Sequence, residues 1–352
     1  MSGLLKVGVI GTGGIAWAHF PGWQESPHAE MVAFADVSEE RLHNAGSQQG
    51  VHRLYTSAEE LLADKDIDIV DICTPNHLHT PLAMAALEAG KHVICEKPLA
   101  TTSAEIHKLI EARNRSGKLL MTAQHFRFDG RAAALKAEID TGVLGEVYHT
   151  RCWVLRRAAA PVWSPGFYRK EQSGGGPCID IGVHILDLAL WYMGHPTPVT
   201  VTGVTQDKLA KVPGAFSIWG GKLPAEFDVE EFATAFVRFD NGASLILEVS
   251  WLLHHLTEQE DMQMWLYGTN GGAHWPRNDI LTSDNDSQQL SHTQIDRHEH
   301  GSPHAKEIMA FAEAVALGKP SPVPPEQSLI VQSILDGLYL SAEQGREVSL
   351  HL

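Results

Sequence analysis

The chain has 352 residues, a length that suggests about two domains, each with a substantial core. Its formal net charge of -16 at pH 7 argues against nucleic acid and against anionic membrane surfaces, both of which call for basic patches. The N-terminus lacks the basic stretch and apolar core of a signal peptide, and no apolar run could span a bilayer. We therefore expect a cytoplasmic enzyme that acts on a small molecule. Buried free thiols are expected at Cys73, Cys95, Cys152 and Cys178.

The first forty residues carry the pattern of a strand, a glycine turn and a helix. An apolar run at 4–10 predicts a buried strand, and 17–25 predicts a helix. Between them, Gly11 permits a tight turn, Gly13 lets a pyrophosphate approach the backbone, and Ala16 lets the helix pack on the strand. Phosphates would then lie at a helix N-terminus, where free N–H groups and the helix dipole favour anions. Predicted cofactor contacts in this turn are Gly11, Thr12, Gly13, Gly14, Ile15 and Ala16.

A second apolar strand, predicted over 31–35, ends at Asp36. A carboxylate at this point can hold the ribose hydroxyls of adenosine and would repel a 2′-phosphate, so we prefer NAD over NADP. A glycine turn alone is weak evidence, because such turns also arise for purely structural reasons. The strand, the helix and the acid around it favour dinucleotide binding.

Strands and helices then alternate along the first third of the chain, as a doubly wound α/β domain requires. Capping boxes at Ser57 and Thr102 predict helix starts, and strands are expected over 67–73, 92–95 and 119–123. In an open parallel sheet, ligands bind beyond the carboxyl ends of the strands. Further cofactor contacts are therefore predicted from Thr74, Pro75, Asn76, His79, Glu96, Lys97 and Gln124.

The domain boundary is predicted at 124/125, giving a Rossmann NAD-binding domain over 1–124 and an α+β domain over 125–352. The segment 156–176 has too little periodicity for a regular element, and its aromatic and basic side chains could form one wall of a polar pocket. A well-anchored structural loop is an equal alternative. Candidate substrate contacts here and at the boundary are His125, Arg156, Trp163 and Tyr168.

A glycine run at 174–176 opens a helix that is expected to stop at Gly194. Asp180, His184 and Asp187 share one face of that helix by their spacing. An acid beside an imidazole suits proton transfer, because histidine titrates near neutrality and a carboxylate can orient or charge it. Taken alone, this spacing is more often structural than catalytic.

Beyond this helix the hydrophobic period changes to two, and strands are expected over 199–204, 231–239, 243–251 and 261–267. Asp-Asn-Gly at 240–242 predicts a hairpin between the second and third of these strands, and the third should have one packed face and one wet face. Further helices are expected over 303–317 and 327–343. Four histidines raise the question of a metal, but they lack a recognisable ligand pattern, so no metal is expected at His292, His298, His300 and His304.

The glycine turn, Asp36, the segment 74–79 and Glu96-Lys97-Pro98 together resemble the glucose-fructose oxidoreductase, inositol dehydrogenase and rhizopine-catabolism (Gfo/Idh/MocA) family. Asp-x-Gly-x-His at 180–184 resembles that family's substrate-site helix. The resemblance implies a second domain with a large, mostly antiparallel sheet and a homodimer or homotetramer. It also implies NAD-dependent hydride transfer from a secondary alcohol of a sugar, polyol or glycoside.

The same resemblance places Lys97 beside the nicotinamide and makes Lys97, Asp180 and His184 catalytic, the last two also binding substrate, while Asp187 stays structural. Which of Lys97 and His184 is the formal base stays open, because coupled groups titrate as a unit. Redox-neutral, NAD-recycling glycoside cleavage and keto-sugar reduction remain alternative activities. A non-enzymatic cofactor-binding regulator is a further alternative, against which the retained catalytic residues argue.

Overall fold

The computed structural model describes residues 3–296 and 299–351, and the chain forms two compact units. The first unit is Met1–Phe128 with Gly301–Leu329, and the second is Asp129–His300 with Ile330–Leu352. The single predicted boundary at 124/125 therefore misses one feature, because residues 301–329 return to the first unit. The reason is packing: α10 (Pro303–Leu317) lies against α1 (Gly14–Glu25), where Gly22 leaves room for the backbone of Ala305.

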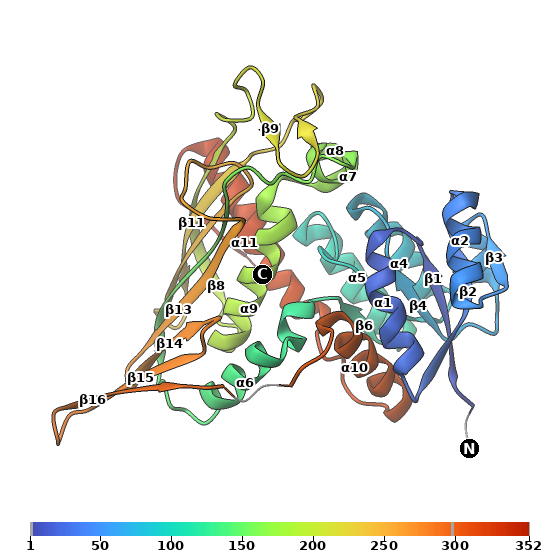
Figure 1. Ribbon diagram of the computed structural model, residues 1–352. Coiled ribbons are helices and arrows are strands. Elements are labelled where there is room, and N and C mark those ends of the chain that lie inside the picture. Colours follow the sequence, from blue (N-terminus) through green and yellow to red (C-terminus); the bar gives the residue numbers. More distant parts are fainter. Residues whose placement is uncertain (1–2, 297–298, 352) are drawn as a thin grey trace. The chain divides into compact units, whose positions relative to one another are not determined.

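The first unit contains a six-stranded parallel sheet in the order β3-β2-β1-β4-β5-β6, the doubly wound arrangement that the sequence predicted (Figure 1). Its strands are β1 (Leu5–Ile10), β2 (Ala29–Ala35), β3 (Arg53–Tyr55), β4 (Ile69–Ile72), β5 (His92–Cys95) and β6 (Leu120–Thr122). Its other helices are α2 (Glu39–Gln49), α3 (Ala58–Ala63), α4 (His79–Glu88) and α5 (Ser103–Ser116), with short 3₁₀ turns η1 (Asn76–Leu78) and η2 (His125–Phe128).

Both faces of this sheet are covered by helices. One core layer contains Phe20 and Trp23 of α1 with Phe311 of α10, and the other contains Leu87 of α4 and Leu109 of α5. A parallel sheet needs both faces buried, and these two layers meet that need. The predicted helix caps are confirmed, because the side chains at positions 57 and 102 accept hydrogen bonds from the backbone N–H groups three residues on.

The second unit contains a nine-stranded sheet in the order β16-β15-β14-β13-β7-β12-β11-β8-β17. Every neighbouring pair is antiparallel except β7 and β12, so the predicted mostly antiparallel sheet is confirmed. The strands are β7 (Val147–Arg156), β8 (Pro198–Gln206), β11 (Phe232–Phe239), β12 (Ser244–Ser250), β13 (Glu260–Gly268), β14 (Gly271–Trp275), β15 (Asp279–Asp284), β16 (Gln289–Gln294) and β17 (Val348–Ser349). The helices are α6 (Gly130–Ile139), α7 (Pro165–Tyr168), α8 (Lys170–Ser173), α9 (Val183–Met193) and α11 (Pro325–Gln344), with a π-helical turn η3 (Cys178–Gly182) and a two-stranded ribbon of β9 (Phe216–Ser217) and β10 (Gly221–Lys222).

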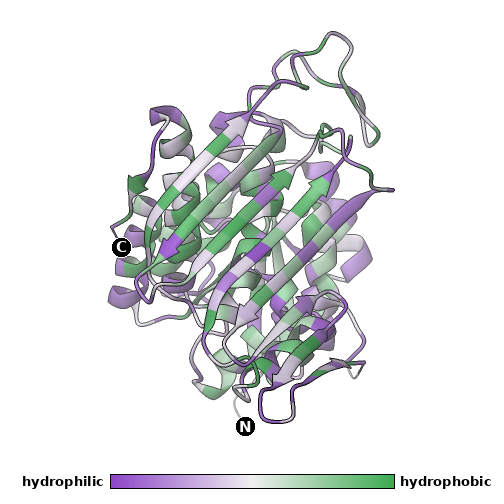
Figure 2. Ribbon diagram, turned by 90° about the vertical axis from the view of Figure 1, so that its left-hand side faces the viewer, coloured by the Kyte–Doolittle hydropathy of each residue, from purple (hydrophilic) through white to green (hydrophobic). Residues whose placement is uncertain are grey.

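One face of this sheet is packed, and the positions of the other face are only partly buried. The ribbon in Figure 2, coloured by residue hydropathy, shows both polar and apolar residues along these strands. Leu245, Leu247 and Val249 of β12 are fully buried, as predicted for the packed face. The predicted wet face is wrong at Ser250, which is also fully buried because its hydroxyl bridges the backbone N–H and carbonyl of Arg156 on β7. The predicted hairpin between β11 and β12 is confirmed.

Two stretches gain regular structure that the sequence did not reveal. The segment 156–176 contains the one-turn helices α7 and α8, and the polar stretch after residue 270 forms β14, β15 and β16. All side chains of β16 are exposed, so it lacks the alternation that marks a half-buried strand. Among the helices described, none is long and apolar enough to cross a bilayer. All four cysteines are buried and unpaired, as predicted.

Candidate active site

The glycine turn has the shape that a pyrophosphate site needs. Gly11 has φ of +90°, and a methyl group there would lie 2.5 Å from the carbonyl oxygen of Cys73. Gly13 caps the N-terminus of α1, and a methyl group on Gly13 or Gly14 would meet no atom of the described residues within 4 Å. This open space beside the first N–H groups of a helix is a cradle that a side chain would fill and a phosphate can enter.

The acid after β2 is built into the same turn. Asp36 accepts hydrogen bonds from the backbone N–H of Thr12 at 2.9 Å and of Ser38 at 2.8 Å, and Arg41 Nη2 lies 2.9 Å from it. Burial raises the pKa of this carboxyl, but the Arg41 hydrogen bond and the two N–H donors outweigh burial and lower it. The carboxylate is therefore ionised, and it fits the ribose of NAD better than a 2′-phosphate.

The side chain of His79 anchors the loop after β4. His79 is 1% exposed, with Nδ1 2.7 Å from the carbonyl oxygen of Pro98 and Nε2 2.8 Å from that of Thr74. Burial lowers its pKa. The ring joins two loops through these two carbonyl contacts, and its predicted direct contact with the cofactor stays a prediction. Within the described part of the chain the buried hydroxyl of Thr74 has no hydrogen-bond partner, so it can serve a cofactor. Pro75 is exposed, and Asn76 begins η1.

Glu96 and Lys97 follow β5 with different roles. Glu96 is 5% exposed; His19 Nε2 lies 2.9 Å from its Oε1, and its Oε2 accepts the backbone N–H of Lys97 at 3.1 Å. Burial raises the pKa of Glu96, but the His19 hydrogen bond and nearby positive charges lower it to about 2. Glu96 thus holds the backbone of Lys97, and its assignment as a direct cofactor contact stays a prediction. Lys97 itself is partly exposed. Gln124, after β6, is 1% exposed, and its buried Oε1 has no hydrogen-bond partner in residues 3–296 and 299–351.

In the second unit, the glycine run is explained by close packing. A side chain on Gly175 would overlap the hydroxyl of Tyr339, and one on Gly176 would overlap the backbone oxygen of Glu230. The half-buried Glu230 carboxylate accepts the N–H groups of Gly176 at 3.0 Å and Cys178 at 3.3 Å and the Tyr339 hydroxyl at 2.8 Å. Sequence reasoning missed Glu230. In the sequence Glu230 is only the first of two adjacent acids at the start of a predicted strand. Such a pair does not by itself indicate a structural or a functional role.

The predicted catalytic helix begins with the π-helical turn Cys178–Gly182, so its residues do not share one regular helical face. π-turns inside helices are frequent at functional sites. Asp180, on this turn, accepts the indole N–H of Trp251 at 3.3 Å and lies 3.8 Å from Arg156 Nη1. His184 in α9 is 6% exposed and Asp187 is 1% exposed.

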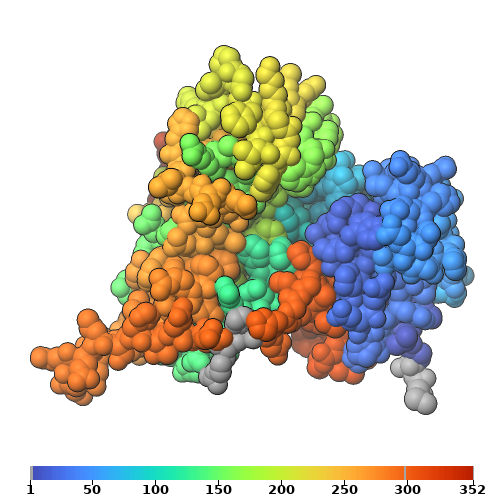
Figure 3. Space-filling view, in the orientation of Figure 1, coloured from blue at the N-terminus to red at the C-terminus, as the bar shows by residue number. Residues whose placement is uncertain are grey.

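An aromatic surface lies beside Arg156. Trp163 is 60% exposed, and its ring centroid lies 5.8 Å from that of Trp219, over which the Arg156 guanidinium sits at 4.6 Å. The segment that carries Trp219 (yellow) packs on the segment that carries Trp163 (green) in Figure 3. Sequence reasoning missed Trp219, which lies in the turn between β9 and β10. The ring of Tyr168 is buried against Phe227, and its predicted sugar contact stays a prediction.

The structure therefore gathers the predicted cofactor residues and Lys97 in the first unit, and Asp180, His184, Arg156 and Trp163 in the second. Of the four histidines weighed as metal ligands, His292 lies 2.9 Å from Asp279 Oδ1 in the second unit, and His304 belongs to α10 in the first. His298 lies outside the described residues.

A Rossmann unit with an acid after its second strand, joined to a unit built on a broad antiparallel sheet, defines an NAD-binding oxidoreductase. Residues 5–124 match the model of the oxidoreductase family with an NAD-binding Rossmann fold, and residues 132–274 match that of the GFO/IDH/MocA C-terminal domain. The chain belongs to the Gfo/Idh/MocA oxidoreductase family, and the predictions of family, fold class and NAD are confirmed.

Similar proteins cover nearly the whole chain. D-Glucoside 3-dehydrogenase of Escherichia coli (strain K12) is 33% identical over 350 residues, covering 98% of this chain and 97% of that protein. Levoglucosan dehydrogenase of Pseudarthrobacter phenanthrenivorans is 30% identical over 283 residues, 76% of this chain and 72% of that protein. A solved structure of levoglucosan dehydrogenase in complex with NADH and L-sorbose superimposes with a TM-score of 0.85 at 26% identity, covering 99% of this chain and 100% of that one.

Proposed function

We propose that this protein is an NAD-dependent dehydrogenase that oxidises a secondary ring hydroxyl of a glucoside or related sugar. The observation that carries the proposal is the match to a D-glucoside 3-dehydrogenase over 98% of this chain, which includes both units. The levoglucosan dehydrogenase complexes with NADH and a sugar support the same substrate class.

The residues of the first unit suit cofactor binding and charge stabilisation. When bound, NAD supplies the hydride acceptor. The N-terminus of α1 would hold its pyrophosphate, and Asp36 would hold the adenosine ribose. Lys97 is fixed through its own backbone by Glu96. Its ammonium group would stabilise the negative charge that develops on the substrate oxygen as the C–H bond breaks.

The residues of the second unit suit proton transfer and sugar recognition. His184 would accept the hydroxyl proton, acting together with Lys97 as a coupled pair. Asp180 is held by Trp251 and Arg156, so its carboxylate can orient a hydroxyl or the imidazole. The exposed faces of Trp163 and Trp219 can stack on the C–H face of a sugar or on an aglycone.

The proposal is tested by following NADH formation with NAD and a panel of alkyl glucosides, levoglucosan, free glucose and inositols, and by repeating the assay with NADP. We expect turnover with a glucoside and NAD. Lys97→Ala and His184→Ala should each lower kcat by about 10²- to 10⁴-fold while NAD still binds. Lys108→Ala, an exposed lysine of α5, should leave kcat unchanged. Near-normal kcat in either active-site variant would overturn these roles.

The predicted homo-oligomer and cytoplasmic location also remain proposals. The face of the large sheet that carries Phe236, Ile246 and Trp265 is half-buried in one chain, and this mixed surface would suit a contact between copies. The four unpaired, buried cysteines fit a reducing compartment. Sedimentation velocity tests the first proposal, and a monomer at micromolar concentration would refute it.

A further inference from the structure

A cluster of imidazole and carboxylate groups lies inside the first unit. Its five residues come from four separate segments of the chain. The ligand atoms of His125, His304 and Glu307 all lie within 4.8 Å of one another. Those of His19, Glu96 and Glu307 do the same, so Glu307 belongs to both groups. Ligand atoms of one tetrahedral zinc ion lie roughly 3.4 Å apart, so small side-chain rotations would bring either group to that spacing.

Glu307 is a buried acid whose charge and hydrogen-bonding capacity no neighbouring group of the described chain satisfies. Its side chain is fully buried in α10, and neither carboxyl oxygen has a hydrogen-bond partner among the residues that the structure describes. The backbone N–H of Gln124 acts on this carboxyl electrostatically without meeting hydrogen-bond geometry. Burying a carboxyl group without a partner costs several kcal/mol, roughly 2–7 even for an uncharged polar group. A buried acid that faces two or three imidazoles in this way has the donor set of a cation site.

His19 is oriented as metal-bound histidines usually are. Its Nδ1 lies 3.0 Å from Asp71 Oδ2, and the same oxygen accepts the indole N–H of Trp23 at 2.8 Å. With Nδ1–H donated to Asp71, His19 directs Nε2 at the Glu96 carboxylate, 2.9 Å away. A proton on Nε2 satisfies this contact as an ordinary hydrogen bond, and a metal ion bound to both groups would take the place of that proton. A histidine held by a carboxylate on its far nitrogen is the arrangement that orients metal ligands.

The other two histidines stack face to face. The ring centroids of His125 and His304 lie 3.9 Å apart with an interplanar angle of 18°. Both rings are only partly buried, so the cluster has an accessible side as well as a closed side formed by Glu307. An ion can therefore enter from solvent.

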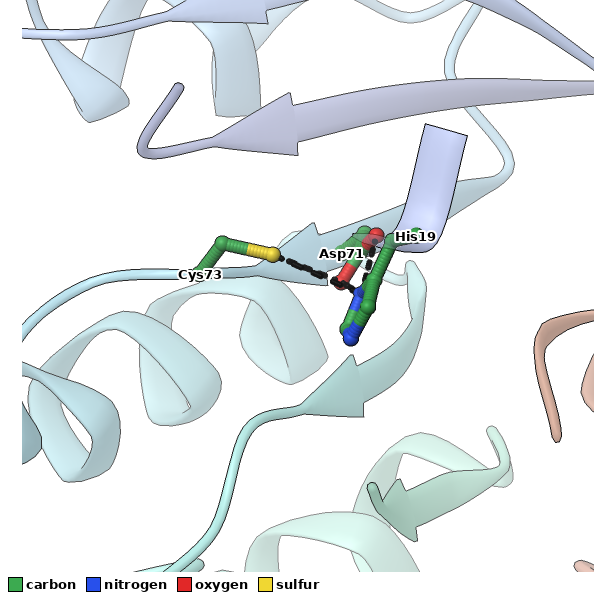
Figure 4. Close-up of side chains that lie close together, drawn as sticks. All are labelled: His19, Asp71 and Cys73. Carbon is green, nitrogen blue, oxygen red and sulfur yellow. Dashed lines mark hydrogen bonds and ion pairs between the residues drawn. The ribbon is translucent and has the colours of Figure 1, made fainter. Parts of the chain in front are cut away.

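A second possible group shares His19 but is already satisfied. His19, Asp71 and Cys73 lie together, as Figure 4 shows. The Asp71 carboxylate accepts from His19, from Trp23 and from the Cys73 thiol at 3.4 Å. Burial raises the pKa of that thiol well above its usual range, so it stays protonated. This group forms a support for His19 rather than a ligand set.

We propose that His125, His304 and Glu307 bind one divalent transition-metal ion, with His19 and Glu96 completing its coordination from the closed side. Imidazole and carboxylate donors suit zinc, and also iron or manganese. The ion would tie α1 and α10 to the loop after β5, whose Glu96 holds the backbone of Lys97. The role is positional, and the proposal does not rest on the dehydrogenase activity. This proposal departs from the sequence-based expectation of no metal. That expectation considers His304 only together with the histidines near it in the sequence.

The test uses the full-length protein without a histidine tag, stripped with a chelator and titrated with Zn²⁺ by calorimetry. We expect one zinc ion per chain, at least about tenfold weaker binding in Glu307→Gln and in His304→Gln, and unchanged binding in His292→Gln. The last variant removes the exposed histidine beside Asp279 and controls for surface binding. Circular dichroism checks that each variant folds.

Zinc that raises Tm in the wild type and not in the two cluster variants would support the site independently. If Glu307→Gln fails to fold, His304→Gln decides, because His304 is partly exposed in the first turn of α10. A visible d–d band in the Co²⁺-loaded wild type that is lost in His304→Gln gives a spectroscopic readout. Absence of stoichiometric binding of Zn²⁺, Co²⁺ and Mn²⁺ by the wild type, or equal binding by both cluster variants, would overturn the proposal.

Discussion

Adding a methyl group should have a different effect at each of two positions of the glycine turn. Gly13→Ala should weaken NAD binding and leave the fold intact, whereas Gly11→Ala should damage the fold. The difference follows from the space around each residue. A methyl group on Gly13 points into open space at the N-terminus of α1, whereas one on Gly11 would lie 2.5 Å from the backbone oxygen of Cys73.

For Gly13 the effects on stability nearly cancel. Gly13 has φ of -73° and ψ of -170°, which alanine adopts without strain. Alanine is a poorer helix N-cap than glycine, which lowers the free energy of unfolding by about 0.5–1 kcal/mol. Alanine also makes the unfolded chain less flexible, which raises the free energy of unfolding by about 0.4–1 kcal/mol. The methyl group would separate the pyrophosphate from the helix N–H groups. Losing one hydrogen bond to a charged group costs about 1.5–3 kcal/mol, so Kd for NAD should rise about 10- to 150-fold.

For Gly11 the same substitution carries two penalties. The positive φ of +90° costs about 1–2 kcal/mol for alanine, and overlap with a fixed backbone atom adds about 1–3 kcal/mol. Tm should fall by on the order of 10 °C for a unit of this size. Calorimetric titration with NAD and differential scanning fluorimetry measure both variants side by side. Wild-type affinity for NAD in Gly13→Ala would show that the pyrophosphate does not use this turn.

Three further outcomes follow from the other side chains. Asp36→Asn removes the charge beside Arg41, so kcat/KM with NADP relative to NAD should rise at least about tenfold; an unchanged ratio would contradict the role of Asp36. Trp219→Ala should raise KM for aryl glucosides several-fold more than for methyl glucoside, whereas an equal change for both would place Trp219 outside the substrate site. Glu230→Ala leaves two buried N–H groups without an acceptor, at about 1–3 kcal/mol each, and should lower Tm more than Glu230→Gln; equal Tm values would refute the capping role.

The parts of the fold that the sequence predicted rest on local physics. A serine or threonine three residues before a glutamate caps a helix wherever it occurs, and both predicted caps are present. Asn-Gly fits the backbone twist of a two-strand hairpin, and β11 and β12 pair as expected. Gly11 adopts the positive φ that its place in the turn requires. In each case the determining contacts lie within a few residues.

The parts that were missed depend on contacts between distant residues. The strand β16 is exposed along its length and is held by backbone pairing with β15, so side-chain periodicity could not reveal it. His79 and Glu96 have the residue types and positions of cofactor contacts, and the sequence did not reveal the contacts by which each holds a neighbouring loop. Sequence position places a residue at the end of a strand. It does not decide between facing the ligand and supporting a residue that does.

The buried cluster around Glu307 also depends on contacts between residues that are distant in the sequence. Its members lie at positions 19, 96, 125, 304 and 307, and no spacing along the chain marks them as a set. His304 was weighed with His292 and His300, although those residues belong to the second unit and His304 belongs to the first. The chain crosses between the units at Gly301, and proximity in sequence stops predicting proximity in space at that point. A metal pattern can be recognised from sequence only where its ligands share one helix, turn or hairpin, and this cluster instead depends on the packing of α10 against α1.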